Sequence, residues 1–595
     1  MSSQIESSTI RKIWSLLTPK ERKSVIILLG LIFVGMLLET LGVGLVIPAI
    51  ALLTQNNFVQ KYPALLPVLA ELGNPSQKAL VIGGMLSLVS VYLIKAVFLA
   101  GLFWRQTRFA YDMQVRLSQL MFTIYMRQPY TFHLQRNSAK LIHNVAGEVG
   151  NLIGNAILPG MILITESMVL VGMCTMLLIF EPVGTLVVVS VLGVAAWGFH
   201  RVTRKHISRW GAARQHHDVL RTQHLQQGLG GIKDVKLLGR EADFLQQFYI
   251  HNFKGAYVAR MQGILQQLPR LWLELLAVSG LAILVISMLA QNNPLEAILP
   301  TLGLFAAAAF RLMPSVNRIL NGVQSIRYGM HGIDTLHAEL NLASSVPTSK
   351  GTLKPFFTAL ELSQISYAYP QASKPALSDI SLTIQRGESV GFIGPSGSGK
   401  STLVDIFLGL LAPDAGQVIM DSDNIQESLR NWQDQIGYVP QSIYLTDDTL
   451  RRNVAFGLAN DQIDDIAVMS AVRAAQLDGF VAGLPDGLET IVGERGVRLS
   501  GGQRQRIGIA RALYHDPDVL VLDEATSSLD NETERGVMDA VKILRGKKTV
   551  VIVAHRLSTV EHCDRLYRLE SGRIVEEGTP GTMIIQTHKE SGSGV

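Results

Sequence analysis

The sequence predicts a multidomain membrane protein: a six-helix all-α transmembrane domain followed by an α/β P-loop domain. Two observations predict it. Long apolar stretches fill the chain up to about residue 340, and a glycine-rich loop stands between a strand pattern and a helix pattern after residue 359. Of the 595 residues, 48% are hydrophobic and only 17% are charged, whereas an average soluble domain has about 25% charged residues. A wholly soluble enzyme, a disordered chain and a collagen-like fibre are therefore excluded.

Charge and cysteine content exclude two further classes. The net charge is +5, but the basic residues flank apolar runs instead of forming one patch with aromatic residues, so no nucleic-acid partner is expected. The two cysteines, Cys174 and Cys563, lie far apart. They predict no disulfide framework and fit a reducing compartment for the soluble part.

Six apolar stretches are long enough to cross a bilayer, which takes about 20 residues per helix. Lys and Arg residues are concentrated before the first stretch, between the second and third, and between the fourth and fifth, while the connections 181–182 and 292–294 carry none. This asymmetry predicts that both termini lie in the cytoplasm. The six predicted spans are 24–54, 79–104, 150–180, 183–200, 268–291 and 295–321.

The segments around the spans complete the first domain. The two basic connections are rich in helix formers, and a helical extension of about 30 residues reaches some 45 Å beyond the lipid. Residues 8–20 are expected to form an amphipathic elbow helix on the inner surface. Residues 56–76 fit either an amphipathic helix on the outer interface or a simple loop. We expect a transmembrane domain over 1–340, a linker over 341–358 and a second domain over 359–595.

The second domain begins with strand patterns, and the one over 381–394 leads directly into a phosphate-binding loop. Residues 394–401 read GPSGSGKS, the pattern G-x-x-x-x-G-K-[ST] between a strand and a helix. Glycines let backbone N–H groups surround the phosphates, Lys400 adds positive charge, and the Ser401 hydroxyl can bind Mg²⁺. The following helix adds its dipole. The expected nucleotide ligands are Gly394, Pro395, Ser396, Gly397, Ser398, Gly399, Lys400, Ser401 and Thr402.

A second pattern supplies acidic groups. Residues 519–524 read VLVLDE, a buried parallel strand that ends in two acids. Asp523 is expected to hold Mg²⁺, directly or through water, and Glu524 to polarise the attacking water. An acid pair after a strand is often only a helix N-cap, but the phosphate loop upstream favours the catalytic interpretation.

A third motif separates this chain from kinases, GTPases and helicases that share the phosphate loop. Residues 499–503 read LSGGQ and lead into a basic helix pattern. LSGGQ is the signature of ABC transporters, and the chain resembles that family over about residues 359–580. The other matching positions are Tyr369 for the aromatic on adenine, Gln441 for the Q-loop, 493–496 for the exporter X-loop, Asp530 at the end of the D-loop, and His555 for the switch histidine.

The resemblance implies that the chain binds ATP and Mg²⁺ as part of a head-to-tail dimer. ATP would lie between the phosphate loop of one subunit and Ser500, Gly501, Gly502 and Gln503 of the other, with Asp530 also at the nucleotide. The implied catalytic residues are Gln441, Glu524 and His555, and the implied metal ligands are Ser401, Gln441 and Asp523. Because the chain has one complete set, it resembles a half-transporter, and a homodimer is favoured over a heterodimer.

The first domain resembles the type IV ABC exporter architecture, with six spans and long cytoplasmic extensions. Residues 130–145 and 230–244 resemble the segments around the two coupling helices of that family. The implied mechanism is alternating access, in which ATP binding closes the nucleotide domains and reshapes the spans.

The cargo is indicated by charges in the spans, which cost about 2.5–3.5 kcal/mol each at mid-helix and therefore usually mark function. Lys95, Arg270, Arg311 and Arg318 could line a cavity for pyrophosphate or another anionic head group. Alternatively, they pair internally with Glu39, Glu166 and Glu274.

The segment 309–318, together with the outer helix, resembles bacterial lipid-linked oligosaccharide flippases. The resemblance implies that the positive residues of the spans face a pyrophosphate. The predicted function is thus ATP-driven movement of a lipid-linked oligosaccharide or other anionic glycolipid across the bacterial inner membrane. A multidrug, lipid or peptide exporter is the alternative, and an ABC ATPase that moves no cargo is a remote one.

Overall fold

The computed structural model describes residues 11–45, 76–180, 182–290, 295–342, 356, 358–370, 372–493, 496–525, 531–554 and 556–583. The chain divides into two compact units. One consists of Met1–Gln128 and Gln135–Val346, and the other of Pro129–Leu134 and Pro347–Val595. The outer helix expected within 56–76 and the end of the first span lie outside the described residues.

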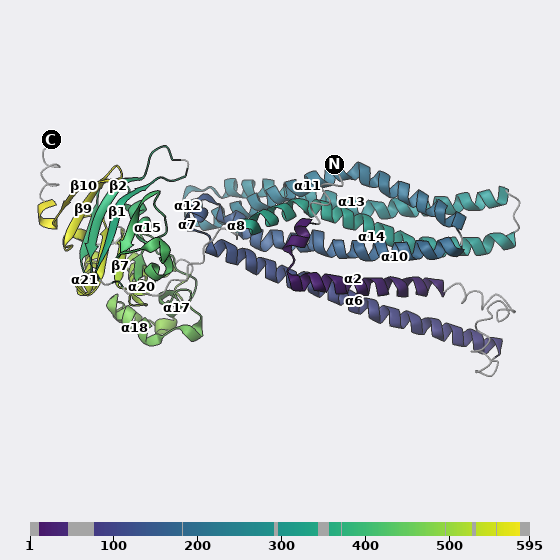
Figure 1. Cartoon of the computed structure of the whole chain (residues 1–595), viewed down its shortest axis with the longest axis horizontal. Coiled ribbons are helices and arrows are strands. Elements are labelled where there is room, and N and C mark those ends of the chain that lie inside the picture. The colour runs from purple at the N-terminus through teal and green to yellow at the C-terminus, as the bar shows by residue number, and fades with distance from the viewer. Residues whose placement is uncertain are drawn as a thin grey trace. The chain divides into compact units, whose positions relative to one another are not determined.

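Long helices that run alongside one another form the first unit (Figure 1). By length and hydropathy, three described stretches qualify as membrane spans: Pro19–Gly44, Lys78–Arg127 and Ser138–Ile179. The described part of each predicted span is helical. Four of the helices, α6, α11, α13 and α14, continue well beyond the predicted boundaries, as expected of extensions outside the lipid. Within the described residues the long helices are α2 (Pro19–Gly44), α6 (Gln77–Arg127), α10 (Leu158–Phe180), α11 (Pro182–Gly230), α13 (Glu241–Ala290) and α14 (Leu295–Asn341).

The first long helix begins five residues earlier than the predicted span, because local capping fixes its start. The Thr18 side chain accepts a hydrogen bond from the Glu21 backbone N–H, and the Glu21 carboxylate accepts one from the Thr18 N–H at 2.7 Å. Pro19 occupies the first helical position, where its missing N–H has no cost. Hydropathy alone does not register such a cap.

Short helical segments connect the long ones. The third span is reached through α8 (Ser138–His143), a π-helical turn at Asn144–Glu148, α9 (Val149–Leu152) and a second π-helical turn at Ile153–Ile157. Glu148 in the first π turn is fully buried, and its carboxylate pairs with His143 at 3.0 Å and with Arg214 at 3.4 Å. The remaining short helices of this region are α7 (Tyr130–Gln135) and α12 (Ile232–Leu238).

Two sheets organise the second unit. A four-stranded antiparallel sheet has the order β2-β1-β4-β5, and a six-stranded sheet has the order β10-β9-β3-β8-β7-β6. In the larger sheet, neighbouring strands from β9 to β6 are parallel and β10 is antiparallel to β9. The strands are β1 (Ala359–Tyr367), β2 (Leu377–Gln385), β3 (Ser389–Ile393), β4 (Ala415–Met420), β5 (Asp423–Asn424), β6 (Ile436–Val439), β7 (Val519–Asp523), β8 (Thr549–Val553), β9 (Arg565–Glu570) and β10 (Arg573–Gly578).

Helices complete the second unit and pack on its sheets. They are α15 (Lys400–Phe407), α16 (Leu429–Gln433), α17 (Leu450–Val454), α18 (Asp465–Ala474), α19 (Asp478–Ala482), α20 (Gly501–Leu513), α21 (Asn531–Leu544) and α22 (Leu557–Val560), with 3-10 turns at Ile425–Glu427, Asn460–Gln462 and Gly487–Glu489. Residues 381–394, expected to form one strand, are split between β2 and β3, which belong to different sheets. The chain turns at Gly387, whose φ of +77° lies in the left-handed region that favours glycine.

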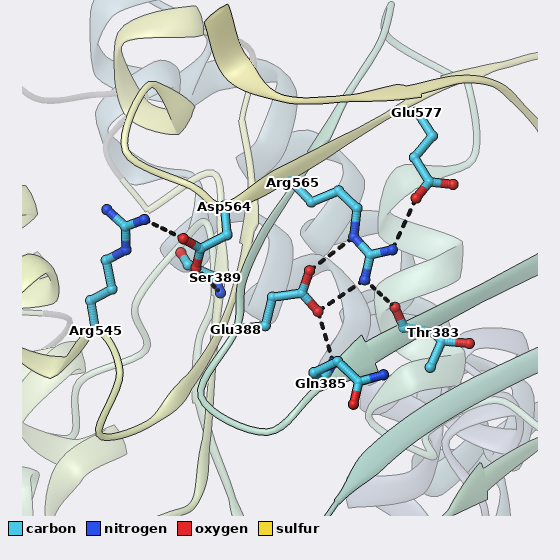
Figure 2. A network of polar contacts seen from close by, with 8 residues as sticks. All are labelled: Thr383, Gln385, Glu388, Ser389, Arg545, Asp564, Arg565 and Glu577. Atoms are coloured by element: carbon cyan, nitrogen blue, oxygen red, sulfur yellow. Dashed lines mark hydrogen bonds and ion pairs between the residues drawn. The ribbon is translucent and has the colours of Figure 1, made fainter.

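A network of charges joins the two sheets (Figure 2). The Arg565 guanidinium at the start of β9 donates two hydrogen bonds to Glu388, both 2.9 Å, and one of 2.6 Å to the Thr383 carbonyl of β2. It also pairs with Glu577 on β10 at 2.9 Å. Burial lowers the pKa of Arg565, but the hydrogen bonds to Glu388 and Glu577 outweigh it and raise that pKa above its ordinary value. Arg565 is therefore charged, and its hydrogen bonds and ion pairs link strands β2, β9 and β10.

Candidate nucleotide-binding site

The phosphate loop follows β3, whose five residues are all buried. Gly394 and Gly399 have φ values of +145° and +103°. A Cβ atom on Gly394 would lie 2.1 Å from the Leu569 carbonyl oxygen, and one on Gly399 would lie 2.8 Å from that of Ala376. Glycine is therefore required at both positions by backbone conformation and by space.

Lys400 is the first residue of α15 and is only 4% exposed. Its ammonium group donates to the carbonyl oxygens of Gly394 and Pro395, both at 2.9 Å, so the loop curls around the positive charge. Burial lowers the pKa of Lys400, and the carboxylates of Glu524 and Asp523 oppose that shift. The charge therefore lies near both acids at the end of β7.

The remaining loop residues leave room for a phosphate. In the described part of the chain Ser398 Oγ is buried and has no hydrogen-bond partner, which fits a hydroxyl that is available to a bound group. The other predicted ligands of the loop, Pro395, Ser396, Gly397 and Ser401, are exposed. The donor set, namely one ammonium, hydroxyls and an open glycine loop, fits a nucleotide phosphate with Mg²⁺.

The acid pair lies where the sequence predicted it, at the end of β7. Gln441 Nε2 donates to Glu524 Oε2 at 2.6 Å. Strands β6 and β7 are parallel neighbours, with Val439 in register with Leu522. Gln441, which follows β6, therefore lies at the same carboxyl end of the sheet as Asp523 and Glu524. Glu524 itself has a φ of +47°, which is uncommon for a non-glycine residue, and its N–H donates to the Val553 carbonyl at 3.0 Å.

Tyr438 is a site residue that the sequence reasoning missed. Its hydroxyl donates to Asp523 Oδ2 at 3.4 Å, and burial raises its pKa above the ordinary range. The signal was available, since Tyr438 precedes Gln441 by three residues in a strand pattern. A tyrosine in a strand is usually interpreted as a core-packing residue, however. Only the β6–β7 register shows that the Tyr438 hydroxyl lies next to Asp523.

Tyr369 and Thr402 lie together. The Tyr369 hydroxyl and Thr402 Oγ1 are 3.2 Å apart, and the Tyr369 ring meets Tyr367 edge-to-face with centroids 5.2 Å apart. The aromatic expected at the adenine is therefore placed at the first turn of the phosphate-loop helix.

The signature residues begin α20. Ser500 is the N-cap, its side chain accepting from the Gln503 N–H at 3.2 Å while the Gln503 side chain accepts from the Ser500 N–H at 2.8 Å. This capping box engages those two amides and not those of Gly501 and Gly502, which open the helix. The arrangement fits an anion at the helix N-terminus. His555, Asp530 and residues 494–495 lie outside the described residues.

Three of the four cations predicted to contact cargo are paired with carboxylates. Lys95 Nζ lies 2.7 Å from Glu39, and Arg270 lies 2.9 Å from Glu274. Arg318 pairs with Glu166, which also accepts a 2.7 Å hydrogen bond from the Ser315 hydroxyl. For these three cations the structure shows the internal pairing that the sequence left as an alternative. The side chain of Arg311 lies outside the described part of the structure.

One of these pairs lines a cavity within the first unit. The cavity has a volume of about 350 Å³, and its wall is formed mostly by apolar side chains of α2, α6 and α10. Arg318 is 56% exposed there, although its partner Glu166 is only 8% exposed. The polar lining residues are Glu39, Gln106, Thr165, Glu166 and Arg318.

Comparisons with known proteins agree with both units. Residues 31–288 match the family "ABC transporter transmembrane region", and residues 377–527 match the family "ABC transporter". The chain is 31% identical over 601 residues to an ATP-dependent lipid A-core flippase of Cupriavidus metallidurans, covering 97% of this chain and 94% of that protein. It is also 31% identical over 501 residues to the flippase of the same name from Dechloromonas aromatica, covering 84% and 85% of the two chains. A solved bacterial Atm1-family ABC exporter with ATP bound has a similar fold, with a TM-score of 0.76, 22% identity and coverage of 95% and 96%.

Proposed function

The chain belongs to the ABC transporter family, and we propose that it is a homodimeric flippase that uses ATP to move an anionic glycolipid across the bacterial inner membrane. That it is an integral membrane exporter coupled to ATP hydrolysis follows from the family. Two observations together support the proposal. Lys400, Gln441 and Glu524 lie near one another at the carboxyl end of the larger sheet, and the other unit of the chain consists of long apolar helices.

The nucleotide chemistry proposed for this site uses residues that already lie together. Lys400 neutralises phosphate charge, and the Glu524 carboxylate accepts a proton from the attacking water. Gln441 Nε2 orients that carboxylate by donating a 2.6 Å hydrogen bond to Oε2. Ser401, Asp523 and Gln441 would hold Mg²⁺, which supplies further positive charge to the β- and γ-phosphates. His555 is proposed to contact the γ-phosphate. Thr402 and Tyr369 fit the nucleoside side of the loop.

A second copy of the chain would complete this site. Ser500, Gly501 and Gly502 offer a helix N-terminus with unengaged amides, and Gln503 fixes its cap. The exposed leucines of α12 also support dimerisation, since Leu237 and Leu238 are 80% and 68% exposed. Burying them against the partner copy would remove apolar surface from water.

The cargo proposal rests on Arg318 and on the relatives. Lipid A-core flippases are named for an amphipathic glycolipid cargo. Arg318, whose guanidinium has five N–H donors, lines a cavity with both apolar and polar walls and pairs with Glu166 through Nη1. A phosphate or pyrophosphate could therefore bind the remaining donors without displacing Glu166. Arg311 precedes Arg318 by about two helical turns on α14. It is proposed as a further contact, together with Lys95 and Arg270.

The topology proposed from the sequence accompanies this function. Both termini would lie in the cytoplasm, with a transmembrane domain over 1–340, a linker over 341–358 and a nucleotide domain over 359–595. The grouping of Pro129–Leu134 with the C-terminal unit supports coupling through residues 130–145. There, burial raises the pKa of Tyr130, with Asp405 and Tyr369 adding to the shift.

The cargo test is stimulation of ATP hydrolysis in liposomes. Purified protein is reconstituted with a lipid A-core glycolipid, a polyprenyl-pyrophosphate oligosaccharide or a neutral glycolipid, and turnover is measured with each. We expect stimulation by the anionic lipids alone, lost in Arg311→Ala and Arg318→Ala with basal turnover retained. Arg201→Ala is the matched control, because Arg201 lies against Trp197 and not at the cavity. Unchanged stimulation in both the Arg311→Ala and the Arg318→Ala variants would contradict the anionic-cargo proposal and leave the ATPase proposal intact.

A further inference from the structure

Four histidines gather on the extensions of α11 and α13. His216, His217 and His224 lie on α11, and His251 lies on α13. The ring centroids of His217 and His251 are 5.3 Å apart, those of His224 and His251 are 5.3 Å apart and stacked, and those of His216 and His217 are 5.2 Å apart. At about 1.5 Å per residue, His217 lies some 50 Å along α11 from Pro182, well beyond a hydrocarbon core of about 30 Å.

Two nitrogens of the cluster already have the spacing of metal ligands. His217 Nδ1 and His251 Nδ1 are 3.1 Å apart. Two nitrogens bound at about 2.0–2.1 Å to one tetrahedral ion lie about 3.3–3.4 Å apart. A hydrogen bond between neutral rings has the same spacing, with one ring donating, so this pair alone fits both.

Protonation and an unsatisfied nitrogen favour a ligand. Burial lowers the pKa values of His217 and His251, and the surrounding charges add to this: His216 and Lys254 for both, and His224 for His251. Asp218, which pairs with Arg221, opposes the shift at His217. The rings are thus neutral at pH 7, the form that binds metal. His224 Nδ1 is buried and has no hydrogen-bond partner among the residues that the structure describes.

The cluster is not a finished metal site. Within the described residues, no group of three or more His, Cys, Asp or Glu side chains has the arrangement to hold an ion. A third protein ligand therefore requires a ring to turn. We choose His224 for this role, because its ring stacks on that of His251 and its Nδ1 is buried. Imidazole nitrogens suit zinc, nickel and copper among the first-row ions.

We propose that His217 and His251, joined by His224 after its ring turns, bind a zinc-class transition-metal ion that clamps α11 to α13. The site is independent of the nucleotide and cargo sites. An ion bound to side chains of both α11 and α13 would resist separation of these two helices, which α12 connects in the chain.

The test is a zinc titration of the full-length protein in detergent, purified through a tag without histidines and stripped with a chelator. At pH 7.5, competition with a chromophoric chelator should show one Zn²⁺ per chain. His217→Gln and His251→Gln should each weaken binding at least about tenfold. His562→Gln, an exposed histidine in the other unit, is the matched control and should change nothing. Binding should be lost at pH 5.5, where the imidazoles are protonated.

A second measurement needs no variant. Zn²⁺ should protect His217 and His251, but not His562, from carbethoxylation by diethyl pyrocarbonate, read by peptide mass spectrometry. The proposal is overturned if the wild-type protein binds no zinc at pH 7.5, or if zinc protects neither His217 nor His251. It is also overturned if a variant that carries both His217→Gln and His251→Gln binds zinc as tightly as the wild type. Stability that depends on pH without zinc binding would identify a proton-binding cluster instead and would equally overturn it.

Discussion

The two ends of the six-stranded sheet use charge in opposite ways. At the amino end, Arg565 meets Glu388, Glu577 and a carbonyl, so its donors are engaged by protein groups (Figure 2). At the carboxyl end, Ser398 Oγ is buried and has no partner within the described residues, and Lys400 donates to the carbonyls of Gly394 and Pro395 in its own loop. The first end stabilises the fold, while the second holds polar groups ready for a ligand, as expected for parallel sheets that bind ligands beyond the carboxyl ends of their strands.

We call the carboxyl end of the strands the open end and the amino end the closed end. The open end carries conformational cost at residues of the nucleotide site itself. Glu524 holds a φ of +47°, and Gly394 and Gly399 allow contacts that no side chain could fit. Strain of this kind costs about 1–3 kcal/mol per residue and persists where a function needs it. The comparison therefore predicts that changes at the open end alter turnover, whereas changes at the closed end alter stability.

The largest expected effect is at the open end. Glu524→Gln keeps the side-chain shape and the Gln441 contact but removes the base, and ATP turnover should fall by about 10²–10⁴ with ATP binding retained. Turnover is measured by phosphate release, and binding by equilibrium dialysis with ATP. Near-normal turnover would refute the role assigned to Glu524.

Sequence patterns predicted the open end better than the closed one. The phosphate loop, Asp523 and Glu524 each depend on local spacing, so 394–401 and 519–524 were sufficient to place them. Local spacing did not show that residues 381–394 divide between two sheets, because that break depends on the turn at Gly387 and on pairing with distant strands.

Contacts between distant segments were the least predictable. Tyr438 reaches Asp523 through the β6–β7 register, and Arg565 reaches Glu388 across 177 residues of chain. The span cations show the same limit. Their residue types indicated function, but only packing shows that Lys95 and Arg318 have carboxylate partners.

The second expected effect concerns the thiol beside the closed end. Cys563 is 5% exposed, and burial raises its pKa to about 11. In a Cys174→Ser background, alkylation at pH 8 should be at least about a hundredfold slower than in unfolded chain, whose thiol has a pKa of about 8.5. The rate should still rise about tenfold per unit between pH 8 and 10, because the thiolate fraction does so below the pKa. A rate that levels off near pH 9 would show a normal, accessible thiol.

The smallest expected effect is on stability, and it compares the contacts of Arg565 with two carboxylates, those of Glu388 and Glu577. Arg565→Ala removes bonds to Glu388, which is 14% exposed, and should destabilise the second unit by about 2–3 kcal/mol. Glu577→Gln removes a carboxylate that is 50% exposed, and should cost less than about 1 kcal/mol. Hydrogen exchange of the β3 and β9 amides measures both variants in the full-length protein.

These variants also test whether the closed end is separate from the chemistry. ATP turnover per folded molecule should be unchanged in both, because Arg565 lies at the start of β9 and the phosphate loop follows the end of β3. If Arg565→Ala lowered turnover as strongly as Glu524→Gln without faster exchange, the charges at the amino end would be part of the catalytic machinery and the division between the two ends would fail. If Glu577→Gln cost as much as Arg565→Ala, the exposed contact between β9 and β10, and not the buried bidentate contact with Glu388, would account for the stability that Arg565 supplies.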